Sequence, residues 1–381
     1  MDLAGARVGI VGGGIGGLAS AIALRRHGIQ VTVFERAETR RREGIALLLW
    51  SNAMRALAAI GAYEAVRARA AAIEVTEIRN AAGELLSQLP IGEWSNGVPT
   101  VAVRRPELVA ALTAMLPVEC VAIGKTFTAY ELCGDRVLAR IADGETVELD
   151  ALIGADGLSS AVRAQLHGEI APRALRQHAW VGVARGVRAL LRPGITTASV
   201  GRGPRFWTAP LDDDSAFWYA TLHHDEHPQC ETIADLSRAF ADWHAPIPQL
   251  LAASRDDDAI ATQICDRPPS DRWGSGPVTL LGDAAHASTP DLGQGACQAI
   301  ESAVVLASSL VHAPTIASGL RAYERLRMDR TATISRLCWL TSVNSTARSA
   351  AVCSVRDAAM RLGLRSLARG PLEWILAGQA C

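Results

Sequence analysis

The sequence predicts an α/β fold, in which a helix-covered parallel sheet is joined to an inserted, mostly antiparallel sheet and to helices at the C-terminal end. Three observations support this prediction. A glycine-rich turn lies between two β-branched runs near the start of the chain. Strand-like segments rich in aromatic residues occupy residues 172–264, and apolar residues with helical spacing recur between residues 295 and 376.

The first unit of the chain reads as strand, turn, helix and strand. Residues 8–11 and 31–35 are rich in β-branched side chains, and the apolar helical stretch between them ends at Gly28. The turn fits G-x-G-x-x-G, a pattern that allows a tight turn, close approach of a pyrophosphate and close packing of the helix on the strand. The unit therefore predicts a Rossmann-like dinucleotide site, with phosphates at the helix N-terminus. Its glycines are Gly12, Gly14 and Gly17.

Glu35 ends the second strand of this unit, about 20 residues beyond the glycines, where an acidic side chain can bind an adenosine ribose. This position favours FAD or NAD over NADP in the pocket. Ile15 and Arg36, which are next to the second glycine and to Glu35, complete the predicted contacts of the unit. A purely structural glycine-rich loop is the alternative.

Composition argues against several other classes. Net charge is −1, the pI is near 6.8, and basic residues are scattered apart from residues 40–42, so no nucleic-acid surface is predicted. The eight cysteines show neither a C-x-x-C pair nor a zinc spacing, and no metal site is predicted. Without a signal sequence or a run of about 18 to 20 apolar residues, we expect a cytoplasmic protein with no integral membrane segment.

The remaining elements are expected in the following order. A short apolar strand leads to Ser51 and Asn52, which are expected to cap a helix that Gly61 ends. A hairpin over residues 73–89 comes next, and Pro106 then begins another helix. Strands and turns fill the chain up to residue 149, and Asp143-Gly144 is the clearest hairpin signal. Further helices are expected at residues 233–243, 295–310, 316–340 and 352–376, the last interrupted at Gly370-Pro371.

The change of pattern at residue 172 occurs without a linker, which predicts an inserted domain rather than a separate one. The cofactor domain is then expected in three parts, residues 1–70, 101–171 and 265–345. Residues 71–100 and 172–264 are assigned to the substrate-binding sheet, and residues 346–381 to a C-terminal helical segment.

Two further motifs follow the single glycine fingerprint. The first is the run from Asp150 to Ser160 with Val162-Arg163, and the second is Leu280 to His286 followed by Thr289 to Glu301. With the N-terminal fingerprint, these ordered motifs make residues 1–340 resemble the class A, single-component flavoprotein aromatic hydroxylases, the para-hydroxybenzoate hydroxylase family. Within that family the sequence is most similar to the salicylate and urate hydroxylase-like branch.

This resemblance implies a tight, non-covalent FAD, with NAD(P)H as a transient co-substrate and O2 as oxidant. An aspartate at a strand end can bind a ribityl hydroxyl, and the N-terminus of the next helix can place backbone N–H groups against the flavin ring. The remaining positions are carried over from the family's motifs, with Arg41 as an alternative to Arg42. The implied cofactor contacts are Arg42, Arg105, Asp156, Arg163, Asp283, Pro290, Gly293, Gln294 and Gly295.

The resemblance also implies that the substrate site lies between the flavin ring and the inserted sheet, with walls from residues 47–49, 206–210 and 218–223 and from the loop at Pro290-Asp291. The polar groups expected to point inward can bind or deprotonate a phenol or lactam. Structural alternatives remain: a turn for the arginine, outward strand positions for the tyrosine and histidine, and a helix cap for the aspartate. These candidate catalytic residues are Arg205, Tyr219, His223 and Asp291.

The expected function is therefore hydroxylation of a small aromatic or N-heterocyclic substrate through a flavin hydroperoxide, by a monomer or homodimer. Two alternatives stay open at this point. One is a flavin-dependent epoxidase or desaturase, and the other is a flavin-binding redox protein without turnover.

Overall fold

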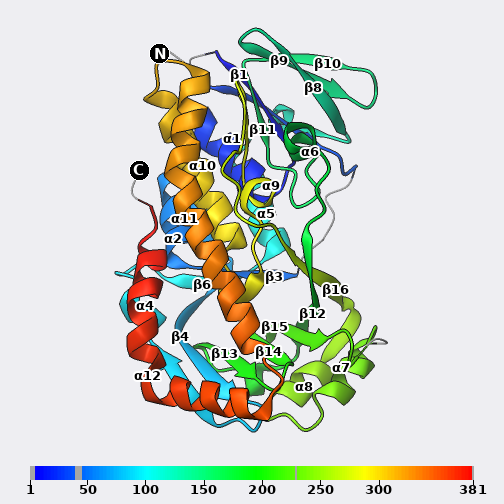
Figure 1. Cartoon of the computed structure of the whole chain (residues 1–381), viewed down its shortest axis with the longest axis vertical. Coiled ribbons are helices and arrows are strands. Elements are labelled where there is room, and N and C mark those ends of the chain that lie inside the picture. Colours follow the sequence, from blue (N-terminus) through cyan, green and yellow to red (C-terminus); the bar gives the residue numbers. More distant parts are fainter. Residues whose placement is uncertain (1–4, 39–44, 228–229, 380–381) are drawn as a thin grey trace.

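The computed structural model describes residues 5–38, 45–227 and 230–379, and its core is formed by two sheets that lie one above the other in Figure 1. The first is a five-stranded parallel sheet in the order β17-β11-β1-β2-β7. The predicted strand–turn–helix–strand unit is present in it, with α1 (Ile15–Arg25) connecting the first two strands. Its strands are β1 (Arg7–Val11), β2 (Gln30–Glu35), β7 (Val121–Ile123), β11 (Ala151–Gly154) and β17 (Val278–Leu280).

The second sheet is larger and mostly antiparallel, with the order β16-β12-β15-β14-β13-β4-β6-β3 and β5 paired to β4. Its one parallel pair joins β13 to β4. Two of its strands, β3 and β6, come from segments that were assigned to the cofactor domain, so the chain crosses between the sheets more often than its pattern indicated. The strands are β3 (Ala46–Leu49), β4 (Ala70–Asn80), β5 (Leu85–Leu89), β6 (Thr100–Arg104), β12 (Arg173–Arg185), β13 (Gly194–Val200), β14 (Arg205–Pro210), β15 (Ser215–His223) and β16 (Ser254–Asp266).

A third, three-stranded sheet, β10-β9-β8, projects beside the first and contains the predicted Asp143-Gly144 hairpin. Helices α10 and α11 run along the molecule in front of the sheets, and α12 turns a corner at the lower end (Figure 1). Shorter helices and turns connect the strands. The third sheet consists of β8 (Phe127–Cys133), β9 (Arg136–Ile141) and β10 (Thr146–Leu149), and the helices are α2 (Ser51–Ala59), α3 (Tyr63–Arg67), α4 (Ile91–Trp94), α5 (Arg105–Thr113), α6 (Ala161–His167), α7 (Ile233–Ala239), α8 (Ile247–Ala252), α9 (Asp283–His286), α10 (Gly295–Val311), α11 (Ile316–Ser345) and α12 (Ala350–Ala377).

Three expectations about helices are wrong. The one helix expected at residues 233–243 ends at Ala239, and a second helix, α8, follows it. Helix α2 begins at Ser51, so its N-cap is Trp50 and no side chain caps it. Helix α12 continues through Pro371 instead of being interrupted there; the proline removes the N–H donor for the carbonyl of Leu367, a residue that is 77% exposed, so water can bind that carbonyl. Among the described residues, no helix is long and apolar enough to cross a membrane.

The two faces of the second sheet bury different side chains. Phe206 and Trp218 stack 5.9 Å apart on the face covered by α7 and α8, where they form a separate core. Trp207 and Phe217 project to the opposite face and pack on the core of the first sheet. Because side chains alternate along a strand, this register fixes which residues face the space between the sheets.

Candidate active site

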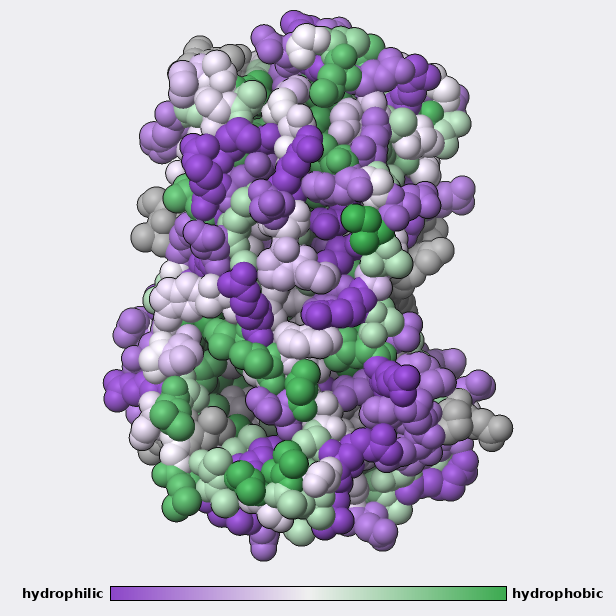
Figure 2. All heavy atoms as spheres, viewed as in Figure 1, coloured by the Kyte–Doolittle hydropathy of each residue, from purple (hydrophilic) through white to green (hydrophobic). Residues whose placement is uncertain are grey.

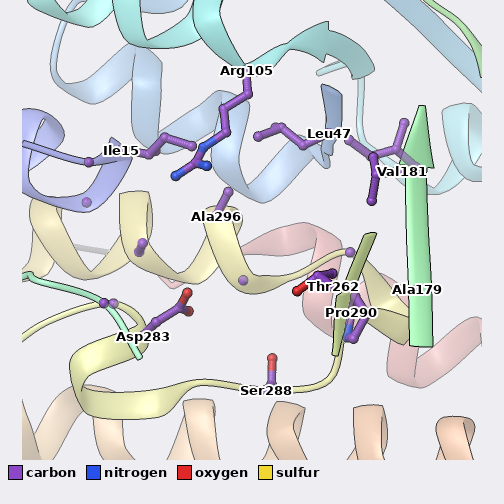
Figure 3. Close-up of a pocket in the computed structure, with 18 of the residues that line it drawn as sticks. Ile15, Leu47, Arg105, Ala179, Val181, Thr262, Asp283, Ser288, Pro290 and Ala296 are labelled. Carbon is purple, nitrogen blue, oxygen red and sulfur yellow. The ribbon is translucent and has the colours of Figure 1, made fainter. Parts of the chain in front are cut away.

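A cavity of about 580 Å³ lies where the C-terminal ends of the first sheet's strands face the second sheet. Open α/β sheets bind ligands at this edge, outside the carboxyl ends of the strands. Figure 3 shows Ile15, Arg105 and Asp283 around one part of the space, and Val181, Thr262 and Pro290 around another. The predicted residues that line it are Gly14, Ile15, Arg105, Tyr219, Asp283, Pro290, Gly293 and Gly295.

The glycine-rich turn has the geometry that a pyrophosphate site needs. Gly12 has φ +104°, and a Cβ there would lie 2.5 Å from the carbonyl oxygen of Ala155. A Cβ on Gly17 would lie 2.0 Å from the carbonyl oxygen of Gly12, so the helix can approach the turn only with glycine. A Cβ on Gly14 would meet no atom within 4 Å. Backbone N–H groups at the start of α1 therefore face open space, as a phosphate site requires.

Glu35 supports this turn from behind. One carboxylate oxygen accepts the N–H of Gly13 at 2.7 Å, and the other accepts the N–H of Ala37 at 2.8 Å. A carboxylate has about four acceptor positions, so both oxygens can still accept from a ribose. Arg36 is exposed and is not part of the described cavity wall, and Arg42 lies outside the described residues.

Arg105 and Asp283 point into the cavity from opposite sides in Figure 3. Arg105 begins α5 and Asp283 begins α9, so the backbone of a helix start fixes each side chain. The exposed part of Asp283 faces the cavity. The protein atoms that surround its carboxyl keep bulk water away and so raise its pKa, whereas the positive charge of Arg105 lowers it. The pair thus offers a polar ligand in the cavity one hydrogen-bond acceptor and one cation.

Three other predicted cofactor residues are not part of the cavity lining but stabilise the elements that form it. Asp156 accepts the N–H of Ala161 at 2.7 Å and so helps to cap α6, while its second oxygen is buried without a described partner. Arg163 is buried and donates to the carbonyl of Ala284 at 3.1 Å, which fixes α9 next to Asp283. Gln294 is the N-cap residue of α10 and is 1% exposed.

At the second-sheet end, three of the four predicted catalytic residues come together. Arg205 forms an ion pair with Asp291 and also donates to Ser345 Oγ at 2.7 Å and Thr221 Oγ1 at 3.1 Å. The Asp291 side chain is 0% exposed, and its second oxygen has no described hydrogen-bond partner. It does not cap α10, so the structural alternative considered for this residue is wrong.

Tyr219 lies on the cavity wall beside this ion pair, and its buried hydroxyl has no described partner. Burial raises its pKa most, Arg205 lowers it and Asp291 raises it further, so the phenol is neutral at neutral pH. His223 is on the same strand face, four residues or about 13 Å farther along. It is not part of the described wall and lies 3.5 Å from Asp225 instead.

The sequence reasoning missed part of the wall. Trp207 fell within a predicted segment, but Phe217 did not, although alternation from Tyr219 predicts that the two share a face. Ala179 and Val181 of β12, and residues 262–265 of β16, match no motif and are placed by strand pairing alone. Apart from Thr262 and Gln263, these residues are mostly apolar, and with the flat rings of Trp207 and Phe217 they suit an aromatic ligand.

Comparison with known proteins decides the family. The sequence model of the FAD-binding domain family matches residues 5–337 of this chain. The chain belongs to the FAD-binding class A monooxygenases. It is 39% identical over 332 residues to aurachin C monooxygenase/isomerase of Stigmatella aurantiaca, covering 86% of each chain. It is 33% identical over 333 residues to a FAD-dependent urate hydroxylase of Klebsiella pneumoniae, covering 84% of this chain and 85% of the relative.

Solved structures agree with this assignment. The crystal structure of Klebsiella pneumoniae HpxO in complex with FAD and uric acid has a TM-score of 0.90 and 28% identity, covering 98% of this chain and 97% of HpxO. A salicylate hydroxylase substrate complex, at 21% identity and a TM-score of 0.79, shows the same fold. This monooxygenase is therefore an FAD-dependent enzyme, and the predicted fold class, family and cofactor are confirmed. The alternative of a flavin-binding protein without turnover is not supported.

The position of Asp283 predicts a clear effect on cofactor affinity. The Asp283→Ala variant should lose one charge-assisted hydrogen bond to FAD, worth ~1.5 to 3 kcal/mol, or roughly tenfold to a hundredfold in affinity. Titration of the apoprotein with FAD, followed by flavin fluorescence, measures this change. An unchanged affinity would reduce Asp283 to the residue that begins α9.

Proposed function

We propose that this monooxygenase hydroxylates a small, flat aromatic or N-heterocyclic substrate that carries an ionisable O–H or N–H, with NAD(P)H as reductant. The reaction balances as substrate, O2, NAD(P)H and a proton giving hydroxylated substrate, water and NAD(P)⁺. Bound FAD supplies the redox chemistry, which is to accept the hydride and to pass its electrons to O2. The protein determines which substrate binds and which polar groups that substrate must carry.

The observation that carries this proposal is the combination of a mostly apolar, aromatic wall with a buried ion pair next to it. Trp207 and Phe217 offer flat surfaces, while Tyr219 offers a hydroxyl beside the Arg205–Asp291 pair. A buried carboxylate is costly unless it is paired or can take up a proton. Asp291 is paired through one oxygen, and its other oxygen is left to accept a proton.

In this arrangement each residue has a separate task. The Tyr219 hydroxyl binds the polar edge of the ring at the cavity wall. Arg205 and Asp291 are not among the residues that line the cavity, so they act next to Tyr219. Arg205 stabilises the negative charge that forms when the substrate loses its O–H or N–H proton, and Asp291 holds Arg205 in place and accepts that proton by way of the Tyr219 hydroxyl. Pro290 and Gly293 close the cavity next to this edge. A deprotonated ring is richer in electrons, which favours attack on an electrophilic oxygen.

Three relatives support this substrate class: the urate hydroxylase named above, a 3-amino-4-hydroxybenzoate 2-monooxygenase of Streptomyces cremeus at 31% identity and a 6-hydroxynicotinate 3-monooxygenase of Pseudomonas fluorescens at 29% identity. Each of these named substrates is a small ring with an acidic hydroxyl, carboxyl or N–H group. The named relatives do not share one substrate, and so the individual compound is left to experiment.

The test is a product screen. The FAD-loaded protein is mixed with NADH or NADPH and with phenols, hydroxybenzoates, hydroxypyridines, quinolones and purines, and products are identified by mass spectrometry. We expect at least one ring with an acidic O–H or N–H to stimulate NAD(P)H oxidation and to gain one oxygen atom, which ¹⁸O2 would label. Its O- or N-methylated analogue is the matched control and should not be hydroxylated. Equal turnover of the methylated analogue would contradict the assigned role of the buried pair.

A further inference from the structure

A buried ion cluster lies beneath the first turns of α10, next to the cavity. Glu301 of α10 is 3% exposed and binds Arg327 at 2.8 Å and Arg330 at 3.0 Å, both from α11. Burial raises the pKa of Glu301, but the two guanidinium groups together hold it below its ordinary value, so the carboxylate is ionised. Two guanidinium groups and one carboxylate give the cluster a net positive charge.

The same carboxylate is connected to the turn that lines the cavity. Asn52 of α2 donates to Glu301 Oε1 and, with the same amide nitrogen, to Gln294 Oε1 at 3.0 Å. Gln298 repeats this bridge, at 3.3 Å to Glu301 and 2.9 Å to Gln294. Gln294 lies between the two glycines of the wall, Gly293 and Gly295. Two amides therefore tie the carboxylate to the middle residue of the turn.

The arginines of the cluster are anchored independently on its far side. Arg330 donates to the carbonyl of Ile375 at 3.0 Å and stacks over Trp374 at 4.4 Å, at the end of α12. Arg327 donates to Gln379 Oε1 at 2.7 Å. In Figure 1 the end of α12 lies beside α2 and α11. Because these contacts do not involve Glu301, its replacement by glutamine removes the charge and one acceptor oxygen, which weakens the connection to the turn, while the arginines keep other partners, among them Gln298 for Arg327.

We propose that Glu301 is a positioning residue: through Asn52 and Gln294 it fixes the backbone of residues 293–295, whose two glycines line the cavity and would hold the flavin ring. Backbone N–H groups stabilise developing negative charge only when they are held in place before the charge appears. A turn that contains two glycines has many conformations to lose, and the buried amide bridges remove that freedom. The proposal concerns the cofactor side of the cavity and is independent of which substrate is hydroxylated.

The first experiment measures the turn without cofactor. Hydrogen–deuterium exchange of the peptide covering residues 289–298 is compared in apoproteins of the wild type, Glu301→Gln and Asn52→Ala. We expect exchange about tenfold faster in both variants, since Asn52→Ala removes one of the two amide bridges to Gln294 and Glu301→Gln weakens both. Glu324→Gln is the matched control, because Glu324 is also buried and paired, with Arg321 at 2.7 Å and Thr279 at 2.6 Å, but makes no described contact with the turn.

The second experiment measures the midpoint potential of bound FAD. The direction in which a substitution shifts this potential separates two mechanisms. Loss of positioning should make the site bind reduced FAD about tenfold less tightly relative to oxidised FAD, which lowers the two-electron potential by about 30 mV. A purely electrostatic role for Glu301 predicts the opposite sign, because Glu301→Gln leaves the cluster more positive. Asn52→Ala changes no charge and should lower the potential as Glu301→Gln does.

The double variant completes the design. If Asn52 and Glu301 act through the same contacts, the double variant should shift the midpoint potential by less than the sum of the two single shifts. An unchanged or raised potential in Asn52→Ala and Glu301→Gln would overturn the proposal, as would faster exchange of the turn with no change in potential. Should Glu301→Gln fail to fold, Asn52→Ala decides the question alone.

Discussion

The Asp291→Asn variant is expected to retain FAD and slow NAD(P)H oxidation but to lose about 10²-fold or more in coupled hydroxylation, the scale of a lost general base. Asparagine keeps the shape of the side chain and can accept one hydrogen bond from Arg205, but it cannot take up a proton. FAD binding should be little affected, because the Asp291 side chain is buried and is not among the residues that line the cavity. The measurement is product formed per NAD(P)H consumed, with a substrate from the screen.

A buried ion pair that loses its carboxylate charge also costs stability, so this variant needs a control that loses the same charge. Asp266→Asn removes the charge of another buried carboxylate: Asp266 is 2% exposed and binds Arg173, whose side chain is 41% exposed, through two hydrogen bonds of 2.8 and 2.6 Å. Both variants should melt at a lower temperature, but only Asp291→Asn should become uncoupled. A wild-type ratio of product to NAD(P)H in Asp291→Asn would remove this residue from the catalytic group.

The Gly14→Val variant is expected to fold normally and to lose FAD affinity by at least about 100-fold, or ~2.7 kcal/mol. The backbone of Gly14 has φ −76° and is extended, a conformation that valine adopts readily. Its Cβ would meet no protein atom within 4 Å, so the added side chain occupies only the space next to the helix N-terminus. A pyrophosphate could then no longer approach the backbone N–H groups.

This prediction separates cofactor binding from folding. The flavin-to-protein ratio after purification and the melting temperature of the apoprotein are both measured. Gly370→Val serves as control, because Gly370 is also surrounded by open space but lies in α12, on the exposed surface. Gly17→Ala should differ from both, because its Cβ would clash with backbone and destabilise the apoprotein itself. Full FAD content in Gly14→Val would place the pyrophosphate elsewhere.

The sequence by itself determined the parts of the site that are built from local backbone geometry. The glycine turn, the helix that follows it and Glu35 were predicted together, because glycine positions and strand periodicity are set by residues close in the chain. Asp283 was predicted from the family resemblance, and its position at a strand end, which places the side chain at the sheet edge, is consistent with that role. Asp156 of the Gly154–Arg163 motif was predicted as a cofactor contact, and only the fold shows that its carboxylate also helps to cap α6.

Only the tertiary structure decided which side chains meet. Arg205 and Asp291 are 86 residues apart, and Asn52 and Glu301 are 249 residues apart. The residues of β14 and β15 that face the cavity depend on register, and a shift of one residue would turn Tyr219 to the other face. His223 shows the same limit, because it has suitable chemistry on the correct face but lies too far along the strand. Local residue types fix backbone conformation, but strand order and register, which depend on packing of the whole chain, fix the partners of each side chain.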